Sequence, residues 1–175
     1  MLPTSSNKML KKYTNKYFVE TGTWGGYAVS VAHWCGFERI YTIEIDEEQY
    51  VYAKSLLEKH GYLKPEHGVS MFLGNSIDIL PDIIPLLDAP ATFWLDAHDT
   101  GVDENCPLYE ELESIKQSPI KNHTIIIDDV RLFGTNFPNI DKKIVQQKLL
   151  EINPDYKITY EDGHIPNDIM VAYYA

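Results

Sequence analysis

The sequence predicts an α/β fold: a seven-stranded, mostly parallel sheet with helices on both faces and a C-terminal antiparallel hairpin. Short apolar runs rich in β-branched and aromatic residues alternate with runs in which apolar residues recur every three or four positions. This alternation indicates parallel strands joined by helices. Only GHIPN (163–167) separates the last two β-type runs. A parallel crossover needs about a dozen residues or more, so these two strands must be antiparallel.

The strands and helices are expected in strict alternation before the hairpin. The runs with strand character are 17–21, 39–45, 69–74, 91–97, 123–129, 156–162 and 168–175. The helical faces between them are marked by Ala28, Val31, Ala32 and Cys35; Tyr50, Ala53 and Leu57; Leu80, Ile83, Ile84 and Leu87; Leu108, Leu112 and Ile115; and Val145, Leu149 and Ile152. Residues 1–16 are expected to form an N-terminal extension and 17–175 a single domain, because 175 residues suit one domain.

Composition limits the classes of function. The 44% of apolar residues predicts a packed core, and the net charge of −11 without a Lys/Arg cluster argues against nucleic acid or an anionic membrane as a partner. No apolar run reaches the ~18 residues of a membrane span, and the start of the chain lacks the apolar core of a signal peptide. The two cysteines form no disulfide framework. We therefore expect a cytoplasmic protein; a secreted domain with free thiols is the alternative.

The first expected strand ends in an acidic residue directly before a glycine-rich turn, in FVETGTWGGYAVS (18–30). Sheets of this type bind ligands beyond the carboxyl ends of their strands, and glycines let a ligand approach the backbone. Gly22, Gly25 and Gly26 do not match the G-x-G-x-x-G pattern, and Glu20 would repel a pyrophosphate. The turn is therefore expected to hold a ligand with a cation and an amine. The alternative is that Glu20 only caps the following helix.

Two further strand ends suit the rest of such a ligand. The second strand ends in Glu44 and Asp46, and a carboxylate there can accept hydrogen bonds from both hydroxyls of a ribose. The third is followed by Asn75 and Ser76, whose amide and hydroxyl could meet the edge of an adenine. S-adenosylmethionine is a cationic, amine-bearing adenosine compound that fits all three turns.

At these motifs the chain resembles the class I S-adenosylmethionine-dependent methyltransferases, whose Rossmann-like sheet of seven strands also ends in an antiparallel hairpin. The turn is similar to the first motif of that family, in the form of an O-methyltransferase branch that reads E-x-G, an aromatic residue, then G-G. The commonest form of the family has glycine where Trp24 stands. The resemblance covers nearly the whole chain. The cofactor-binding residues that it implies are Glu20, Gly22, Thr23, Gly26, Glu44, Ile45, Asn75, Ser76 and Asp96.

Acidic residues also follow the fourth and fifth strands, in WLDAHDTG and IIIDDV. In the expected strand order these strands are neighbours about 4.8 Å apart, so Asp96, Asp128 and Asp129 should lie together. Three close carboxylates repel one another, and the simplest way to offset this repulsion is a Mg²⁺ ion that all three bind. Such an ion would lower the pKa of an acceptor hydroxyl, and His98 could take the proton. Asp96 and His98 are thus the expected catalytic residues. The alternatives are that the Asp pair caps a helix, and that His98 binds the metal ion or contacts one of its ligands.

The macrocin-type metal-dependent O-methyltransferases are similar at these positions, although their base is often aspartate where this chain has His98. The resemblance implies a Mg²⁺-assisted O-methyltransferase that acts on a hydroxyl of a sugar or natural product. A metal-independent methyltransferase and a non-catalytic module that binds S-adenosylmethionine are the alternatives; a glycosyltransferase fits Glu20 poorly. With only about 16 residues before its first strand, the chain suits an open pocket for a small-molecule or glycan acceptor, or a site completed in a homo-oligomer.

Several other residues have structural interpretations. Trp94, within an apolar strand, and Trp34, near the end of the helix after the first strand, are expected to pack in the core. Arg131, just beyond the Asp pair, either binds an acidic group of the substrate or neutralises the acids. Asp99 and Asp103 lie in an expected surface loop and are interpreted as solvated acids.

Overall fold

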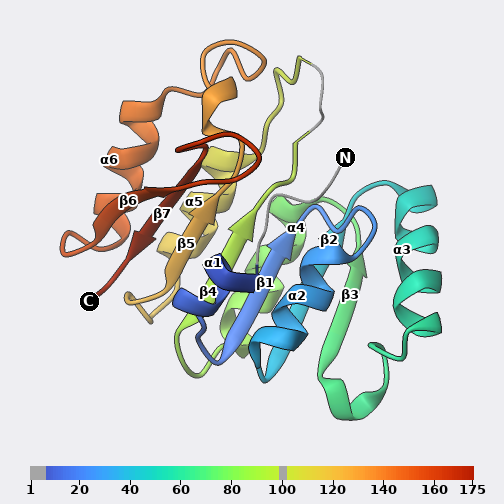
Figure 1. Ribbon diagram of the computed structural model, residues 1–175. Helices are drawn as coiled ribbons and strands as arrows, with labels where there is room; N and C mark the ends of the chain where they lie inside the picture. The colour runs from blue at the N-terminus through green and yellow to red at the C-terminus, as the bar shows by residue number, and fades with distance from the viewer. Residues whose placement is uncertain (1–6, 99–101) are drawn as a thin grey trace.

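A computed structural model describes residues 7–98 and 102–175, so Asp99 and the first six residues of the expected extension lie outside the described part of the chain. Seven strands form one sheet in the order β3-β2-β1-β4-β5-β7-β6 (Figure 1). Their bounds are β1 Tyr17–Thr21, β2 Arg39–Glu44, β3 Val69–Leu73, β4 Ala91–Leu95, β5 Thr124–Ile127, β6 Lys157–Glu161 and β7 Ile169–Tyr173. The five strands from β3 to β5 are parallel, whereas β7 is antiparallel to both β5 and β6. The predicted fold class is confirmed.

Helices connect the parallel strands. The α-helices are α1 Asn7–Lys12, α2 Tyr27–Cys35, α3 Glu47–Lys59, α4 Ser76–Ile83, α5 Leu108–Lys116 and α6 Lys142–Ile152, and short 3₁₀ turns cover Pro65–His67, Ile84–Leu86 and Val130–Leu132. Within the described ranges, none of these helices combines the length and the apolar character that a bilayer crossing requires.

The sheet separates two hydrophobic cores because alternate residues of each strand point to opposite faces. On one face Phe93 and Leu95 of β4 pack with α4, α5 and α6. On the other face Trp94 packs with α1, α2 and Leu57 of α3. Figure 1 shows α1 and α2 in front of the sheet and α4 and α5 behind it. Helices therefore cover both faces and leave the carboxyl edge of the parallel strands as the place for a site.

The two tryptophans that were expected in the core differ in burial. Trp94 is buried in the sheet, as predicted. The prediction for Trp34 is wrong, since its side chain is 76% exposed. Trp34 precedes Cys35, the last residue of α2, and the helix turns Cys35 toward the core and Trp34 toward solvent.

The described part of the expected extension packs against the sheet. Met9 and Leu10 of α1 are buried in the second core, beside Trp94. Tyr13 and Lys12 bind the Glu161 carboxylate of β6, with Oη–Oε1 and Nζ–Oε2 distances of 2.7 and 2.8 Å. Residues 7–13 thus cover the face of the sheet that carries Trp94, over β4, β5 and β7.

A buried histidine joins the beginnings of β4 and β5, the strands that carry the acidic motifs. His123 Nδ1 accepts a hydrogen bond from the Ala91 amide (3.0 Å), and Nε2 lies 2.9 Å from the Ser118 hydroxyl. This network needs a neutral ring. Burial, with a smaller contribution from the charge of Lys121, lowers the pKa of His123 to about 4.

We expect this histidine to make folding acid-sensitive. The ring is neutral in both states above its unfolded pKa of about 6.5, so the full stability is present there. As the pH falls from 6.5 toward 4, the unfolded chain takes up a proton that the folded chain rejects, and about 3 kcal/mol is lost at ~1.4 kcal/mol per pH unit. Urea unfolding at pH 7 and pH 4 measures the loss. In His123→Gln this component should disappear; an unchanged pH profile in that variant would contradict the assignment.

Candidate functional site

The expected site residues lie at the carboxyl edge of the parallel strands. Thr21 of β1 is in register with Leu95 of β4, and Leu95 with Ile127 of β5. The residues that follow, Asp96 and Asp128, therefore leave the sheet side by side. Both predicted strands are shorter in the structure than in the sequence analysis, and the acids begin the loops after them.

The turn after β1 lies against the start of the loop after β4. Gly22 donates its amide hydrogen to the Ile43 carbonyl of β2 (2.9 Å) and has φ +86°, a conformation that favours glycine. A Cβ at this position would lie 2.4 Å from the carbonyl oxygen of Asp96. The missing side chain of Gly22 is therefore what lets the two loops touch.

Glu20 is buried at the end of β1, with only 2% of its surface exposed. Its carboxylate accepts a hydrogen bond from the Thr42 hydroxyl (2.6 Å), which also contacts the Thr23 hydroxyl (2.6 Å). Burial raises the pKa of Glu20 to about 8, although the bond from Thr42 acts in the opposite direction. The alternative that Glu20 caps the next helix is wrong: Gly26 is the N-cap of α2, and no side chain caps that end.

Glu44 ties the first two loops together. One carboxylate oxygen accepts the Trp24 amide (2.8 Å) and the other accepts the Asp46 amide (3.0 Å). Each oxygen keeps a second lone pair for a ligand. Asp46 is used structurally, because its side chain caps α3 by accepting the Gln49 amide (2.9 Å). Of the two acids at this strand end, only Glu44 is left for a ribose.

The remaining predicted adenine-side residues surround the same edge. Ile45 is an exposed apolar side chain directly after β2. Asn75 caps α4 through its side-chain oxygen, which accepts the Ile77 amide (3.1 Å), so its amide group is only partly available to a ligand. Ser76, the first residue of α4, is buried.

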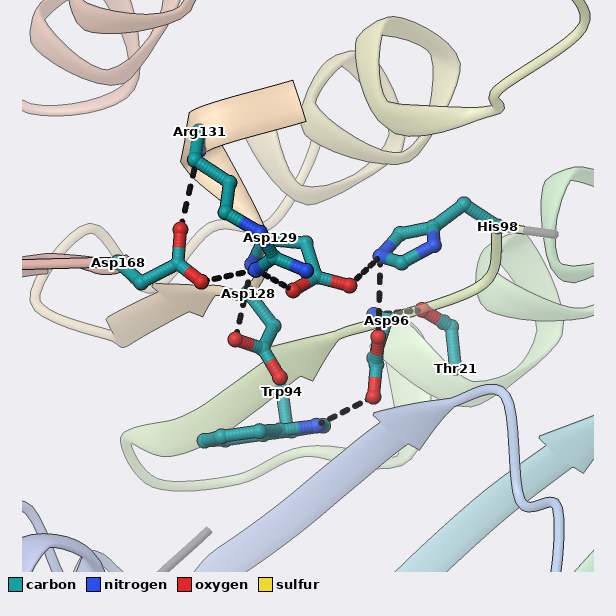
Figure 2. Close-up of polar contacts among 8 residues, drawn as sticks. All are labelled: Thr21, Trp94, Asp96, His98, Asp128, Asp129, Arg131 and Asp168. Atoms are coloured by element: carbon teal, nitrogen blue, oxygen red, sulfur yellow. Dashed lines mark hydrogen bonds and ion pairs between the residues drawn. The ribbon is translucent and has the colours of Figure 1, made fainter. Parts of the chain in front are cut away.

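Asp96, His98 and Asp129 form the central cluster (Figure 2). His98 Nε2 lies 3.1 Å from Asp96 Oδ1 and 3.5 Å from Asp129 Oδ2, and the ligand atoms of the three residues all lie within 4.8 Å of one another. The His98 side chain is 8% exposed, and the two carboxylates are more open. Three residues of this kind can share either a proton or a metal ion.

The charge of His98 follows from its neighbours. Burial alone would lower the pKa of His98, but the hydrogen bond and charge of Asp96, then the charges of Asp129 and Asp128, outweigh it and raise the pKa. The neighbouring acids therefore favour the positively charged form of the imidazole. A metal ion or a sulfonium nearby would oppose that charge and free Nε2.

Asp128 belongs to a second group, with Asp129 and Asp168 (Figure 2). Asp128 Oδ1 accepts the amide of Asp129 (2.8 Å). The guanidinium of Arg131 contacts both Asp129 and Asp168, and the Arg131 amide donates to Asp168 Oδ1 (3.0 Å). The expected set of Asp96, Asp128 and Asp129 is therefore not one group: His98 joins Asp96 to Asp129, and Asp128 lies on the other side of Asp129, with Asp168. Of the two interpretations of Arg131, neutralisation of the acids matches these contacts.

Backbone strain aims Asp129 at the cluster. Asp129 has φ +54°, in the left-handed region that non-glycine residues rarely adopt. The next residue, Val130, donates its amide hydrogen to the Asp168 carbonyl (3.0 Å), which joins the end of β5 to the start of β7. Strain of this kind costs on the order of 1–3 kcal/mol and is concentrated at functional sites.

Sequence reasoning missed Asp168 and Glu111. Glu111 projects from α5 and is 1% exposed. Burial raises its pKa to about 7, while the nearby hydroxyls of Ser76 and Thr21 and the charge of His98 act in the opposite direction. A signal for Glu111 was present, because it falls three positions after Leu108, on the face that the apolar pattern predicted to be buried.

No family model and no curated protein matches the sequence. Solved structures match the fold. A candidate caffeoyl-CoA O-methyltransferase from Staphylococcus aureus is 17% identical over 97% of this chain and 80% of its own, with a TM-score of 0.64. An O-methyltransferase from Bacillus cereus in complex with SAH is 20% identical over 95% of this chain and 78% of its own, with a TM-score of 0.63. TomG from Streptomyces achromogenes, an O-methyltransferase of tomaymycin synthesis in complex with SAM, is 21% identical over 97% of this chain and 77% of its own, with a TM-score of 0.57. At these identities the likeness shows the fold alone, a Rossmann-like sheet that this chain shares with those methyltransferases.

Proposed function

We propose that this protein is an S-adenosylmethionine-dependent O-methyltransferase assisted by a divalent cation. One observation carries the proposal: Asp96 belongs to both halves of the site. Its carbonyl packs against Gly22 in the turn that would bind the cofactor, and its carboxylate contacts His98. A methyl group held by that turn would therefore lie beside the cluster that handles the acceptor. The fold shared with O-methyltransferases supports the same function.

The buried acids fit the cofactor. Burial, and to a smaller extent the charges of Asp96 and Glu44, raise the pKa of Glu20, and a ligand with an ammonium or sulfonium group would stabilise its anionic form. Glu44 has lone pairs left for two hydroxyls. S-adenosylmethionine offers a sulfonium, an ammonium and a ribose diol, which match these two carboxylates. The predicted contacts of Gly22, Thr23, Gly26, Ile45, Asn75 and Ser76 belong to the same proposal.

The reaction moves a methyl group from sulfur to an acceptor oxygen, so the acceptor must lose its hydroxyl proton. His98 Nε2 is the nitrogen that faces the open carboxylates, and it can take that proton once a nearby cation has displaced its own. Asp96 and Asp129 then hold the imidazolium by hydrogen bonds and charge. Alignment of the methyl donor with the acceptor oxygen would lower the barrier further.

The central cluster also fits a metal. Two carboxylates and one imidazole, with ligand atoms within 4.8 Å of one another, make a donor set that suits a divalent ion. An ion held by Asp96, His98 and Asp129 would lower the pKa of the acceptor hydroxyl and orient it. With Nε2 of His98 bound to the ion, the proton of the acceptor would leave to solvent or to a carboxylate, whereas an ion held by the carboxylates alone would leave Nε2 as the base. Because one donor is nitrogen, Mn²⁺ fits this set at least as well as the Mg²⁺ proposed for Asp96, Asp128 and Asp129.

A metal-independent methyltransferase is the second candidate, and Arg131 favours it. The guanidinium already neutralises Asp129 and Asp168. His98, with its raised pKa, neutralises Asp96 in the same way. In that case the cluster is balanced without an ion, the sulfonium of the bound cofactor would displace the proton of His98, and the neutral imidazole would serve as the base alone.

Calorimetric titration with S-adenosylmethionine and S-adenosylhomocysteine, each with and without Mg²⁺ or Mn²⁺, tests the proposal. Heat of binding with both nucleosides is expected, and no heat with either would overturn it. A panel of sugar and natural-product hydroxyls, assayed with and without a chelator, then separates the candidates. Loss of turnover on chelation supports the metal, and unchanged turnover supports the second candidate. Binding without turnover would indicate a non-catalytic module.

A Glu44→Ala variant should bind S-adenosylmethionine about 1–3 kcal/mol more weakly, the usual cost of removing a charged hydrogen-bond partner. Glu44→Gln should lose less, because its amide oxygen still accepts one bond. Calorimetry measures both. The control is Glu48→Ala, an exposed acid in the first turn of α3. Wild-type affinity in Glu44→Ala would mean that the ribose lies elsewhere.

A further inference from the structure

A small cavity lies behind the central cluster, on the side of the sheet that α4, α5 and α6 cover. Its volume is about 10 Å³, about the space that one water molecule occupies. Apolar side chains form most of its wall, including Leu95, Ile127 and Phe137. The polar residues that line it include His98 and Glu111. The cavity therefore joins a residue of the proposed site to an acid that the proposed function does not use.

Glu111 is an unusual residue to find in this position. It is 1% exposed, and its Oε1 atom has no hydrogen-bond partner among the described residues. A buried carboxylate without full pairing is costly, and an apolar residue of similar size would be cheaper. The acid is retained on an otherwise apolar face of α5, with Leu108 and Leu112 beside it. The cost of burying this carboxylate indicates that the acid has a task at this position.

His98 has a matching unpaired atom. Within the described ranges neither ring nitrogen has a well-aligned hydrogen bond, but Nε2 lies 3.1 and 3.5 Å from carboxylate oxygens of Asp96 and Asp129, whereas Nδ1 is buried without such a partner. The ring also packs on Phe137, with 4.5 Å between centroids, so it is not free to turn. A protonated imidazole carries hydrogen on Nδ1. So does a neutral one whose Nε2 lone pair serves as base or ligand. In both states Nδ1–H needs an acceptor.

We propose that Glu111 is a positioning residue for His98, acting through one water molecule held in this cavity. The water oxygen accepts the Nδ1–H of His98, and a water O–H donates to Glu111 Oε1. This arrangement satisfies both unpaired atoms and fixes the tautomer that leaves Nε2 available to the cluster. The inference rests on the proposed function only for the task that it gives to His98.

The state of the His98 ring tests this proposal without cofactor, metal or acceptor. In ¹⁵N-histidine-labelled protein, the signals of His98 are assigned by their loss in His98→Gln. We expect an Nδ1–H proton that exchanges slowly with solvent in the wild type. Glu111→Leu should abolish that signal or speed its exchange by about tenfold or more, whereas Glu111→Gln, whose amide oxygen can accept from the water, should keep it. Glu110→Leu, an exposed neighbour on α5, is the matched control.

Two results would overturn the proposal. One is an Nδ1 without hydrogen in the wild type, which needs no variant and holds even if Glu111→Leu does not fold. The other is the same His98 signal in a folded Glu111→Leu protein. Mn²⁺ titration gives a second measurement: Glu111→Leu should weaken binding about 10- to 100-fold, with recovery in Glu111→Gln. If the nucleosides do not bind but the His98 signal depends on Glu111, the positioning role stands and the methyltransferase proposal fails.

Discussion

A Gly22→Ala variant is expected to lose S-adenosylmethionine binding and about 3 kcal/mol or more of the free energy of unfolding. Two costs combine. The residue has φ +86°, which is strained for any side chain, and the new Cβ would lie 2.4 Å from the carbonyl oxygen of Asp96. The neighbour cannot easily retreat, because the Asp96 amide is bonded to the Thr21 carbonyl (3.2 Å). The two loops must therefore separate, and the proposed cofactor turn moves with them.

Gly25 provides the control within the same turn. Nothing lies within 4 Å of a Cβ at Gly25, and its φ is outside the left-handed region. Gly25→Ala should change the free energy of unfolding by no more than about 0.5 kcal/mol. Urea unfolding and calorimetric titration of both variants make the comparison. Wild-type stability and affinity in Gly22→Ala would show that the turn does not pack against Asp96.

The fold could be read from the sequence because its signals are local. Strand and helix periodicities alternate, and the short GHIPN segment left no room for a parallel crossover. The predicted strand ends were wrong by two residues: the runs predicted to end at Ala97 and Asp129 end at Leu95 and Ile127 in the structure. Trp34 was misassigned because an apolar residue type does not say which side of a helix it occupies, and here it lies next to the buried face rather than on it.

The site could be predicted only in part. Strand neighbours placed Asp96 and the Asp pair at one edge, which follows from register. The grouping could not be foreseen, because the left-handed backbone of Asp129 and the contacts of Arg131 decide which acid faces His98. Asp168 reaches the edge through the antiparallel strand β7, and no motif marks it. These features depend on tertiary contacts.

The largest loss of turnover is expected for His98→Gln. Glutamine fills similar space and can still donate a hydrogen bond to the acids, but it cannot take a proton. General-base catalysis contributes about 10²- to 10⁴-fold, so turnover of an accepted hydroxyl should fall by that factor. S-adenosylmethionine affinity should stay near the wild-type value, because His98 is not among the proposed cofactor contacts. His164→Gln, an exposed histidine of the β6–β7 loop, is the control.

The same variant separates the two tasks proposed for His98. If the imidazole is a metal ligand, His98→Gln should weaken Mn²⁺ binding along with turnover, since the cluster would keep only Asp96 and Asp129. If it is a base alone, Mn²⁺ affinity should persist while turnover falls, and a more acidic acceptor hydroxyl should lose less, because it needs less help in releasing its proton. Turnover equal to the wild type in His98→Gln would remove the histidine from the chemistry, whatever the metal does. Asp96→Asn completes the comparison: it keeps the shape of the side chain and removes the charge that holds His98, so it should lower the pKa of His98 as well as the rate.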